Sequence, residues 1–127
     1  MKVSLPGLIS LCYSNVVELK FIRRVPKIGR PTTRRMLCTS NTDFLNSEKA
    51  KIYFKFTNPV KKLNFSPNAR GLVSVFDLFM LDWRLVPSES TEIISYIPLT
   101  PEEKFWEYFN GILINMTADN KAAFMDK

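Results

Sequence analysis

The sequence predicts an α+β fold in which a small antiparallel sheet is packed by two or three aromatic-rich amphipathic helices. Three observations indicate this fold: short segments with strand-like patterns, later segments with apolar residues at helical spacing, and an uneven distribution of charge. A chain of 127 residues forms one domain with one modest core. Its ten Phe, four Tyr and two Trp provide large apolar side chains for that core.

Three segments are predicted to be strands. Residues 16–22 alternate between apolar residues and the charged Glu18 and Lys20, as a strand with one solvated face does. Residues 52–57 are rich in β-branched and aromatic residues, which favour strands. The short apolar segment 93–97 is the third candidate.

Residues 67–85 are predicted to form a helix. Ser66 is a suitable N-cap, and Pro67 suits the first helical position because its missing N–H has no helical partner there. Large apolar residues follow at the spacing of one helical face. They are Leu72, Phe76, Phe79, Met80 and Trp83.

A second helix is predicted for residues 101–116. Thr100 as the N-cap and Glu103 at the third helical position form a capping box, and acidic residues stabilise the positive end of a helix dipole. The apolar residues of this helix are Phe105, Phe109, Ile112, Leu113 and Met116.

The charge is strongly polarised along the chain. Residues 1–70 contain 14 Lys and Arg but three acidic residues, a net charge of +11. Residues 71–127 contain four basic and nine acidic residues, a net charge of −5. We therefore expect a basic N-terminal segment over residues 1–50, extended as an arm over residues 23–50, followed by a compact α+β domain over residues 51–127.

Three interpretations of the basic segment stay open. An arginine-rich, acid-poor N-terminus that contains Ser and Thr is typical of mitochondrial and plastid targeting segments. Basic residues also bind RNA or another anionic surface, because each phosphate contact releases counterions. The third interpretation is a solvated basic face whose charge the acidic second half balances within the fold.

The candidate residues for binding a partner or an anion are basic and fall into two groups. The first group follows the predicted strand 16–22. The second surrounds the predicted strand 52–57, where lysines interleave with aromatic residues, a pattern that suits single-stranded RNA. The candidates are Arg23, Arg24, Lys27, Arg30, Arg34, Arg35, Lys51, Lys55, Lys61 and Lys62.

The absence of histidine argues against catalysis. It removes the Ser-His-Asp and Cys-His arrangements, the usual general base near neutral pH and most zinc sites. Cys12 and Cys38 have no metal-site spacing; they could form one disulfide, although two thiols are the commoner case. Glu103 and Glu107 lie one helical turn apart and are interpreted as a solvated helix face. We therefore expect no metal, no cofactor and no enzymatic activity.

Two aromatic stripes predict a second candidate site, a pocket for a flat hydrophobic ligand such as a pigment or quinone. The alternative is that these side chains only pack the core, as most apolar stripes do. They are Phe76, Phe79, Trp83, Phe105, Trp106 and Phe109. Asp77 lies within the first stripe, and we expect it to form a structural ion pair with Arg70 or with a lysine of the basic half.

The sequence thus predicts a non-catalytic accessory subunit of a larger protein complex, which docks on other subunits through its basic arm. A mitochondrial or plastid location is expected, with the cytoplasm as the alternative. Two other functions stay open: an RNA-binding or ribosome-associated protein, and a small carrier of an aromatic or hydrophobic ligand. An anionic membrane surface is a further candidate partner, but no apolar run is long enough to span a bilayer.

Overall fold

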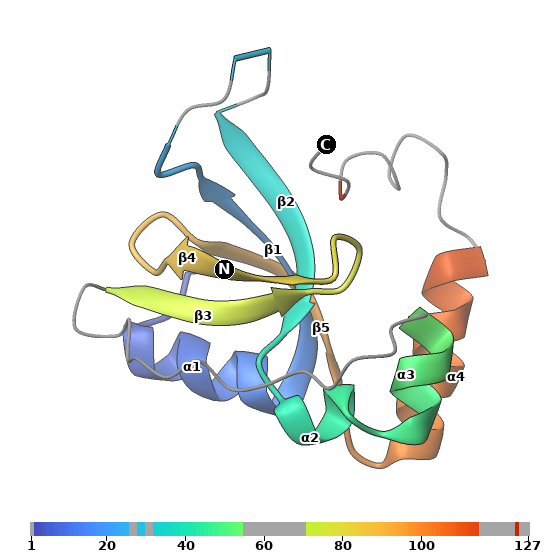
Figure 1. Cartoon of the computed structure of the whole chain (residues 1–127). Coiled ribbons are helices and arrows are strands. Elements are labelled where there is room, and N and C mark those ends of the chain that lie inside the picture. The colour runs from blue at the N-terminus through green and yellow to red at the C-terminus, as the bar shows by residue number, and fades with distance from the viewer. Residues whose placement is uncertain (1, 26–27, 30–31, 55–70, 115–123, 125–127) are drawn as a thin grey trace.

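The computed structural model has an α+β architecture (Figure 1), which confirms the predicted fold class. It describes residues 2–25, 28–29, 32–54, 71–114 and 124. In chain order, the elements are α1 (Leu5–Ser14), β1 (Asn15–Ile22), β2 (Thr33–Thr39), α2 (Thr42–Leu45), α3 (Glu48–Phe54), β3 (Leu72–Asp77), β4 (Asp82–Pro87), β5 (Glu92–Pro98) and α4 (Glu102–Ile114).

The strands form one antiparallel sheet in the order β4-β3-β2-β1-β5. β1 pairs with β2 on one side and with β5 on the other, with a bulge in the β1–β5 pairing at Glu18–Leu19. β2 and β3 share two residue pairs, Cys38 with Asp77 and Thr39 with Phe76. A short ladder therefore joins the β3–β4 hairpin to the rest of the sheet.

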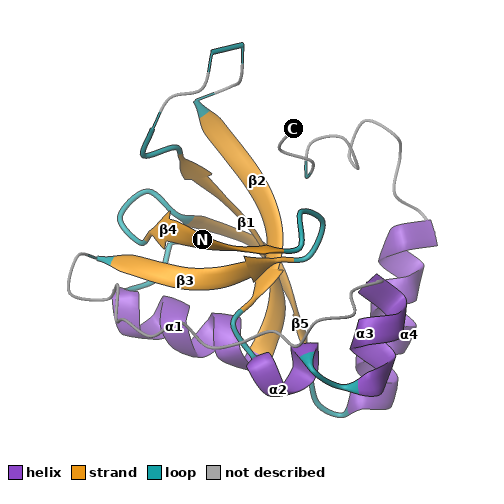
Figure 2. Cartoon of the chain, in the orientation of Figure 1, coloured by secondary structure: helices purple, strands orange, loops and turns teal. Residues whose placement is uncertain are grey.

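Each face of the sheet contributes to a different core cluster. The alternation of β1 places Val16 in one cluster and Val17 in the other. Helix α1 packs its buried Leu8 and Cys12 into the Val17 cluster, and α3 and α4 pack beside each other in the Val16 cluster (Figure 2). The buried aromatic residues of the Val16 cluster are Phe44, Phe76, Phe105, Trp106, Phe109 and Phe124.

Helix α1 was not predicted from the sequence, because Pro6 and Gly7 have poor helix propensity. Pro6 lies in the first turn, where its missing N–H leaves no helical hydrogen bond unmade. Ser4 caps the helix by accepting a hydrogen bond from the Gly7 N–H at 3.2 Å. Leu8 and Cys12, one turn apart, are buried against the sheet, so tertiary packing outweighs the weak local signal.

The strands predicted at residues 16–22 and 93–97 are confirmed as β1 and β5. The helix predicted at residues 101–116 is confirmed as α4, whose described part ends at Ile114. The acids Glu103 and Glu107 of this helix are exposed, as expected of a solvated face.

The helix predicted at residues 67–85 is wrong over the described residues, which form the β3–β4 hairpin. The side chain of Asp77 holds the turn between the strands, because its Oδ1 accepts hydrogen bonds from the N–H groups of Phe79 and Met80 at 3.0 and 3.1 Å. Leu81 closes the turn with a φ of 55°, outside the right-handed helical region. The proposed cap at Ser66 and Pro67 lies outside the described residues.

The strand predicted at residues 52–57 is also wrong where it is described, because residues 52–54 end helix α3. The rings of Tyr53 and Phe54 lie 4.9 and 6.3 Å from that of Trp106 on α4. Helical backbone lets both neighbouring rings reach the same cluster. Aromatic packing therefore overrides the strand propensity of this segment.

The extended arm predicted over residues 23–50 is not confirmed. This stretch contains β2, α2 and the start of α3. Met36 and Cys38 of β2 are fully buried, and even Arg34 is only 4% exposed. The pairing of β2 with β1 and β3 integrates the stretch into the sheet, because its apolar residues have a buried face to fill.

A buried ion pair joins β2 to β3. The Nη2 of Arg34 donates to Oδ2 of Asp77, a residue with no exposed surface. The sequence predicted a structural ion pair at Asp77, but with Arg70 or a lysine as the partner. Arg34 was not predicted because it lies 43 positions away in the chain. With the two N–H donors of the turn, both carboxylate oxygens are satisfied, as a buried charge requires.

We predict that Asp77→Ala lowers the free energy of unfolding by about 3–5 kcal/mol, because Arg34 then stays buried without its counter-ion. Urea denaturation followed by circular dichroism measures the change, and the milder Asp77→Asn serves if the alanine variant does not fold. The control is Asp82→Ala, which removes an exposed ion pair with Arg84 and costs at most about 1 kcal/mol. Equal losses for Asp77→Ala and Asp82→Ala would contradict the role of the buried pair.

Cys12 and Cys38 are free thiols with no exposed surface, in line with the expectation of two thiols. The pKa of Cys38 is raised well above its ordinary value, first by a hydrogen bond with the Cys12 side chain and then by burial. The neutral Cys38 thiol therefore stabilises the folded state at pH values below the ordinary thiol pKa. This contribution is lost as the pH rises toward the raised pKa, because the unfolded chain releases its proton first.

We predict that neither thiol reacts with Ellman's reagent in native buffer at pH 8, because the thiolate is the reactive form and both side chains are buried. In denaturing urea both cysteines should react. The absorbance of the released thiol dianion counts the reacted groups. Rapid reaction of either cysteine in the folded protein would show that the α1–sheet contact opens readily.

Candidate binding site

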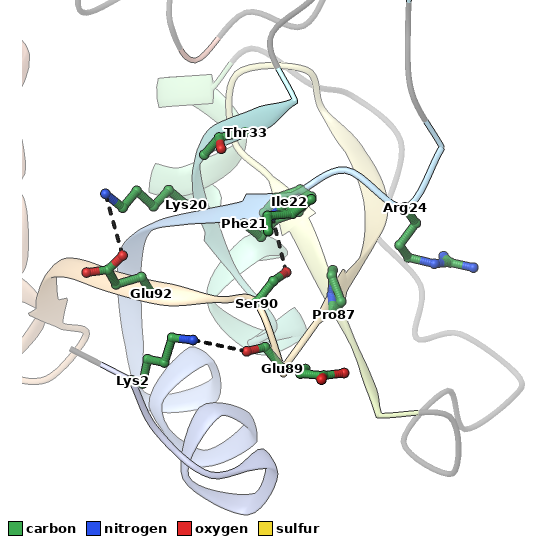
Figure 3. A pocket seen from close by; sticks show the side chains of 10 residues that line it. All are labelled: Lys2, Lys20, Phe21, Ile22, Arg24, Thr33, Pro87, Glu89, Ser90 and Glu92. Carbon is green, nitrogen blue, oxygen red and sulfur yellow. Dashed lines mark hydrogen bonds and ion pairs between the residues drawn. The ribbon is translucent and has the colours of Figure 1, made fainter.

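An open pocket of about 690 Å³ lies where β1 ends beside the β4–β5 turn (Figure 3). Its polar lining has both signs of charge, with three basic and two acidic side chains. Its apolar lining comes from β1 and from the end of β4. The lining residues are Lys2, Lys20, Phe21, Ile22, Arg24, Thr33, Pro87, Glu89, Ser90 and Glu92.

Hydrogen bonds between elements hold the pocket walls together. The Ile22 N–H at the end of β1 donates to Ser90 Oγ at 3.2 Å. Lys20 and Glu92 form an ion pair at 3.5 Å across the β1–β5 ladder, and both side chains stay nearly half exposed. Lys2 Nζ approaches the backbone carbonyl of Glu89 at 3.5 Å, while the Glu89 side chain is exposed (Figure 3).

A smaller pocket of about 160 Å³ shares Phe21 and Arg24 with the first. Arg23, Arg34 and Arg84 add three further guanidinium groups to its lining. Arg34 is bound to Asp77 and Arg84 to Asp82, so these charges are balanced from within the fold. We call the surface formed by Lys2, Lys20, Arg23, Arg24 and Arg84 the basic end of the sheet.

The β1–β2 connection adds exposed apolar side chains to the basic end. Val25 is 75% exposed and Ile28 is completely exposed. Figure 1 places the described part of this connection at the far end of the sheet from α3 and α4. Val25 lines the smaller pocket, so basic and aliphatic side chains meet there.

This arrangement is suited to binding. The described residues contain no group of three His, Cys, Asp or Glu side chains that could hold a metal ion. The sequence has no histidine, and Glu92, a carboxylate at the pocket, is paired with a lysine. Arginine and lysine heads beside aliphatic surface suit carboxylate or phosphate groups on a larger partner.

The structure brings two of the ten predicted basic residues, Arg23 and Arg24, to this surface. Arg34 is buried in its ion pair, although it lines the smaller pocket, and Arg35 bonds Glu18 at 2.6 Å. Lys51 pairs with Glu48 at 3.3 Å along α3, away from the basic end. The remaining predicted residues lie outside the described part of the chain; they are Lys27, Arg30, Lys55, Lys61 and Lys62.

The six predicted pocket aromatics pack with one another and with their neighbours. Phe76, Phe105, Trp106 and Phe109 are buried at 5% exposure or less. Phe79 and Trp83 are partly buried against the same cluster, and neither pocket described above is lined by any of the six. The binding of a flat ligand by these aromatic residues stays a prediction, and neither of the two pockets supports it.

Sequence patterns missed Lys2, Lys20, Arg84 and the β4–β5 turn as parts of one surface. No local motif links them, because separate strands and the segment that precedes α1 bring them together. The sequence did place Lys20 on the solvated face of the predicted strand 16–22. Its neighbour Glu92 could be found only from the register of β1 with β5.

Comparisons of the chain with protein-family models, with curated proteins and with solved structures find no match. The helices among the described residues are too short or too polar to cross a lipid bilayer.

Proposed function

We propose that this chain is a non-catalytic accessory subunit that docks on another protein through the basic end of its sheet. The observation that supports this proposal is that Arg23, Arg24 and the exposed Val25 line one pocket beside a second, while the same β1–β2 connection carries the completely exposed Ile28. Exposed aliphatic side chains rimmed by charge are typical of protein-binding surfaces. The partner should present acidic side chains around an apolar centre.

The docking element differs from the arm expected from the sequence. Arg23 and Arg24 follow directly on β1, and the Arg23 N–H donates to the Thr32 carbonyl at 2.8 Å. The start of the connection is therefore tied to the residue that precedes β2. A partner would meet side chains already positioned by the sheet, which lowers the entropy lost on binding.

The proposal of an organellar location rests on the arginine-rich, acid-poor first 40 residues. The same stretch also provides α1, β1 and β2. A targeting signal in this chain would therefore overlap with residues that the fold uses.

RNA binding is the second candidate function, supported by the concentration of Arg and Lys at the basic end. Single-stranded RNA is usually bound by exposed aromatic rings on which bases stack. The exposed apolar residues here, Val25 and Ile28, are aliphatic, and Tyr53 and Phe54 of the proposed RNA-binding segment pack into the aromatic cluster. We therefore favour a protein partner.

We predict that a photo-crosslinking benzoylphenylalanine in place of Ile28 forms a discrete protein adduct when the full chain is expressed in its native cells and irradiated. The control is the same group in place of Tyr108, which is 62% exposed on α4 away from the basic end. Mass spectrometry of the adduct identifies the class of partner. A nuclease-sensitive adduct would favour the RNA alternative, and equal adducts from both positions would contradict the proposal.

We predict that Arg24→Glu reduces the yield of the Ile28 adduct at least about tenfold, because the reversed charge repels an acidic partner. The matched control is Lys104→Glu, which makes the same change of charge at an exposed position on α4. Thermal melting of both variants checks that the fold is retained. Equal loss of adduct in both variants would indicate a response to net charge rather than docking at the basic end.

A further inference from the structure

All the charged residues that line the smaller pocket are basic. Four of its seven lining residues are arginines, and the other three, Phe21, Val25 and Leu85, are apolar. The larger pocket differs, because its lining includes Glu89 and Glu92. Arginine side chains between apolar walls attract an anion strongly, since charges interact more strongly where apolar groups replace part of the water.

The arginines of the smaller pocket come from separate segments of the chain. They are Arg23 and Arg24 of the β1–β2 connection, Arg34 of β2 and Arg84 of β4. Arg34 lies opposite Phe21 in the β1–β2 ladder, and Arg84 lies opposite Val75 in the β3–β4 ladder. Phe21 and Val75 both belong to the Val17 cluster, and residues opposite each other share a face of the sheet. The two arginines therefore lie on the same face of the sheet, and a ligand in the pocket meets guanidinium groups from different strands.

Contacts within the fold hold two of these guanidinium groups in place. Arg34 is 4% exposed, and its Nη2 donates to Asp77. Nη1 of Arg84 donates to Oδ2 of Asp82 at 2.8 Å and to the Trp83 carbonyl at 3.0 Å. Both bonds of Arg84 use the same nitrogen, and a guanidinium has further N–H donors on its other two nitrogens. Neither Asp77 nor Asp82 lines the pocket, so these acids fix the arginines from outside it and reduce the side-chain entropy lost on binding.

The size of the smaller pocket limits which group can enter it. Its volume of about 160 Å³ equals that of about five water molecules in the liquid, at about 30 Å³ each. A phosphoryl group, which is one phosphorus atom with its oxygens, is roughly of this size. A nucleoside is several times larger and has to stay outside the pocket.

A phosphoryl group matches this set of arginines better than a carboxylate does. The oxygens of a carboxylate lie in one plane, and a single guanidinium fork satisfies them. A phosphate monoester has three terminal oxygens and a charge of about −1.5 to −2 near neutral pH. Arginines from different strands can bond several of these oxygens at once. The arrangement therefore favours the tetrahedral group with the higher charge.

We propose that the smaller pocket binds the phosphoryl group of a phosphorylated side chain on the docking partner. This inference rests on the docking proposed above and adds one chemical requirement, namely that the partner is phosphorylated. A phosphodiester of RNA has a single negative charge and so matches the pocket less well than a monoester. The exposed Val25 in the lining adds an apolar contact beside the phosphoryl group, which suits a protein side chain.

Titration of the full chain with N-acetyl-phosphoserine amide tests the pocket. Heteronuclear NMR follows the backbone amides, and we expect the largest shifts at Val25, Arg34 and Leu85. N-acetyl-glutamate amide is the matched carboxylate, which we expect to bind at least about tenfold more weakly because it has less charge and fewer oxygens. Equal affinities for the two compounds, or shifts spread over all basic residues, would overturn the proposal.

Arg84→Gln and Arg84→Lys test the guanidinium itself. Both should weaken phosphoserine binding at least about tenfold, the second because an ammonium group keeps the charge but lacks the planar fork. The control is Arg35→Gln, which removes the same charge from β2 at a residue that lines neither pocket and lies over Phe124 of the Val16 cluster. Thermal melting verifies that the variants are folded. Equal weakening by Arg84→Gln and Arg35→Gln would show a response to net charge and overturn the proposal.

Photo-crosslinking from position 28 separates this inference from the proposed docking. The chain with benzoylphenylalanine in place of Ile28 is irradiated in an extract of its native cells, with and without prior treatment of the extract by a protein phosphatase. We expect the phosphatase to reduce the yield of the adduct at least about tenfold. An unchanged yield, or an adduct that nuclease removes, would overturn the inference. An unchanged yield of a protein adduct would leave the docking intact, whereas the absence of any adduct would overturn the docking, and the phosphoserine titration then decides the pocket on its own.

Discussion

The buried ion pair of Arg34 and Asp77 is the interaction on which the rest of the sheet depends. β2 and β3 share two residue pairs, so little backbone pairing joins the β3–β4 hairpin to the other strands. The ion pair adds a charged contact across this junction. Asp77 also accepts two hydrogen bonds from the turn that follows β3, so one carboxylate both joins the two parts and shapes the hairpin. Burial of the Asp77 carboxylate is tolerated because both of its oxygens accept hydrogen bonds.

The same interaction decides which basic residues are left for binding. Arg34 and Arg35 belong to the most basic part of the sequence, yet one pairs with Asp77 and the other with Glu18. Part of the large positive charge of the first 70 residues is therefore balanced inside the fold. Arg24 remains exposed where β1 leaves the sheet, beside the apolar Val25. The basic end thus results from strand pairing as much as from the density of Arg and Lys.

The aromatic residues show why helical spacing predicted α4 correctly but predicted a helix wrongly where the chain forms the β3–β4 hairpin. Phe105 and Phe109 lie one turn apart on α4, where helical spacing and helical structure agree. Leu72, Phe76 and Trp83 have the same spacing, but Phe76 and Trp83 face each other across the β3–β4 hairpin at 5.7 Å. A strand buried on both faces has an apolar pattern that a helix can also produce, so local spacing did not distinguish the two.

The sequence by itself determined the α+β class, β1, β5 and α4, because each of these elements has a local pattern or capping signal that tertiary packing does not oppose. It also determined that Asp77 needs a structural partner. Only the tertiary structure decided that the partner is Arg34, that residues 72–87 form a hairpin, and that residues 48–54 form a helix. It alone assembled the basic end of the sheet. These features depend on strand order and register, which join residues far apart in the chain and leave no mark in local spacing.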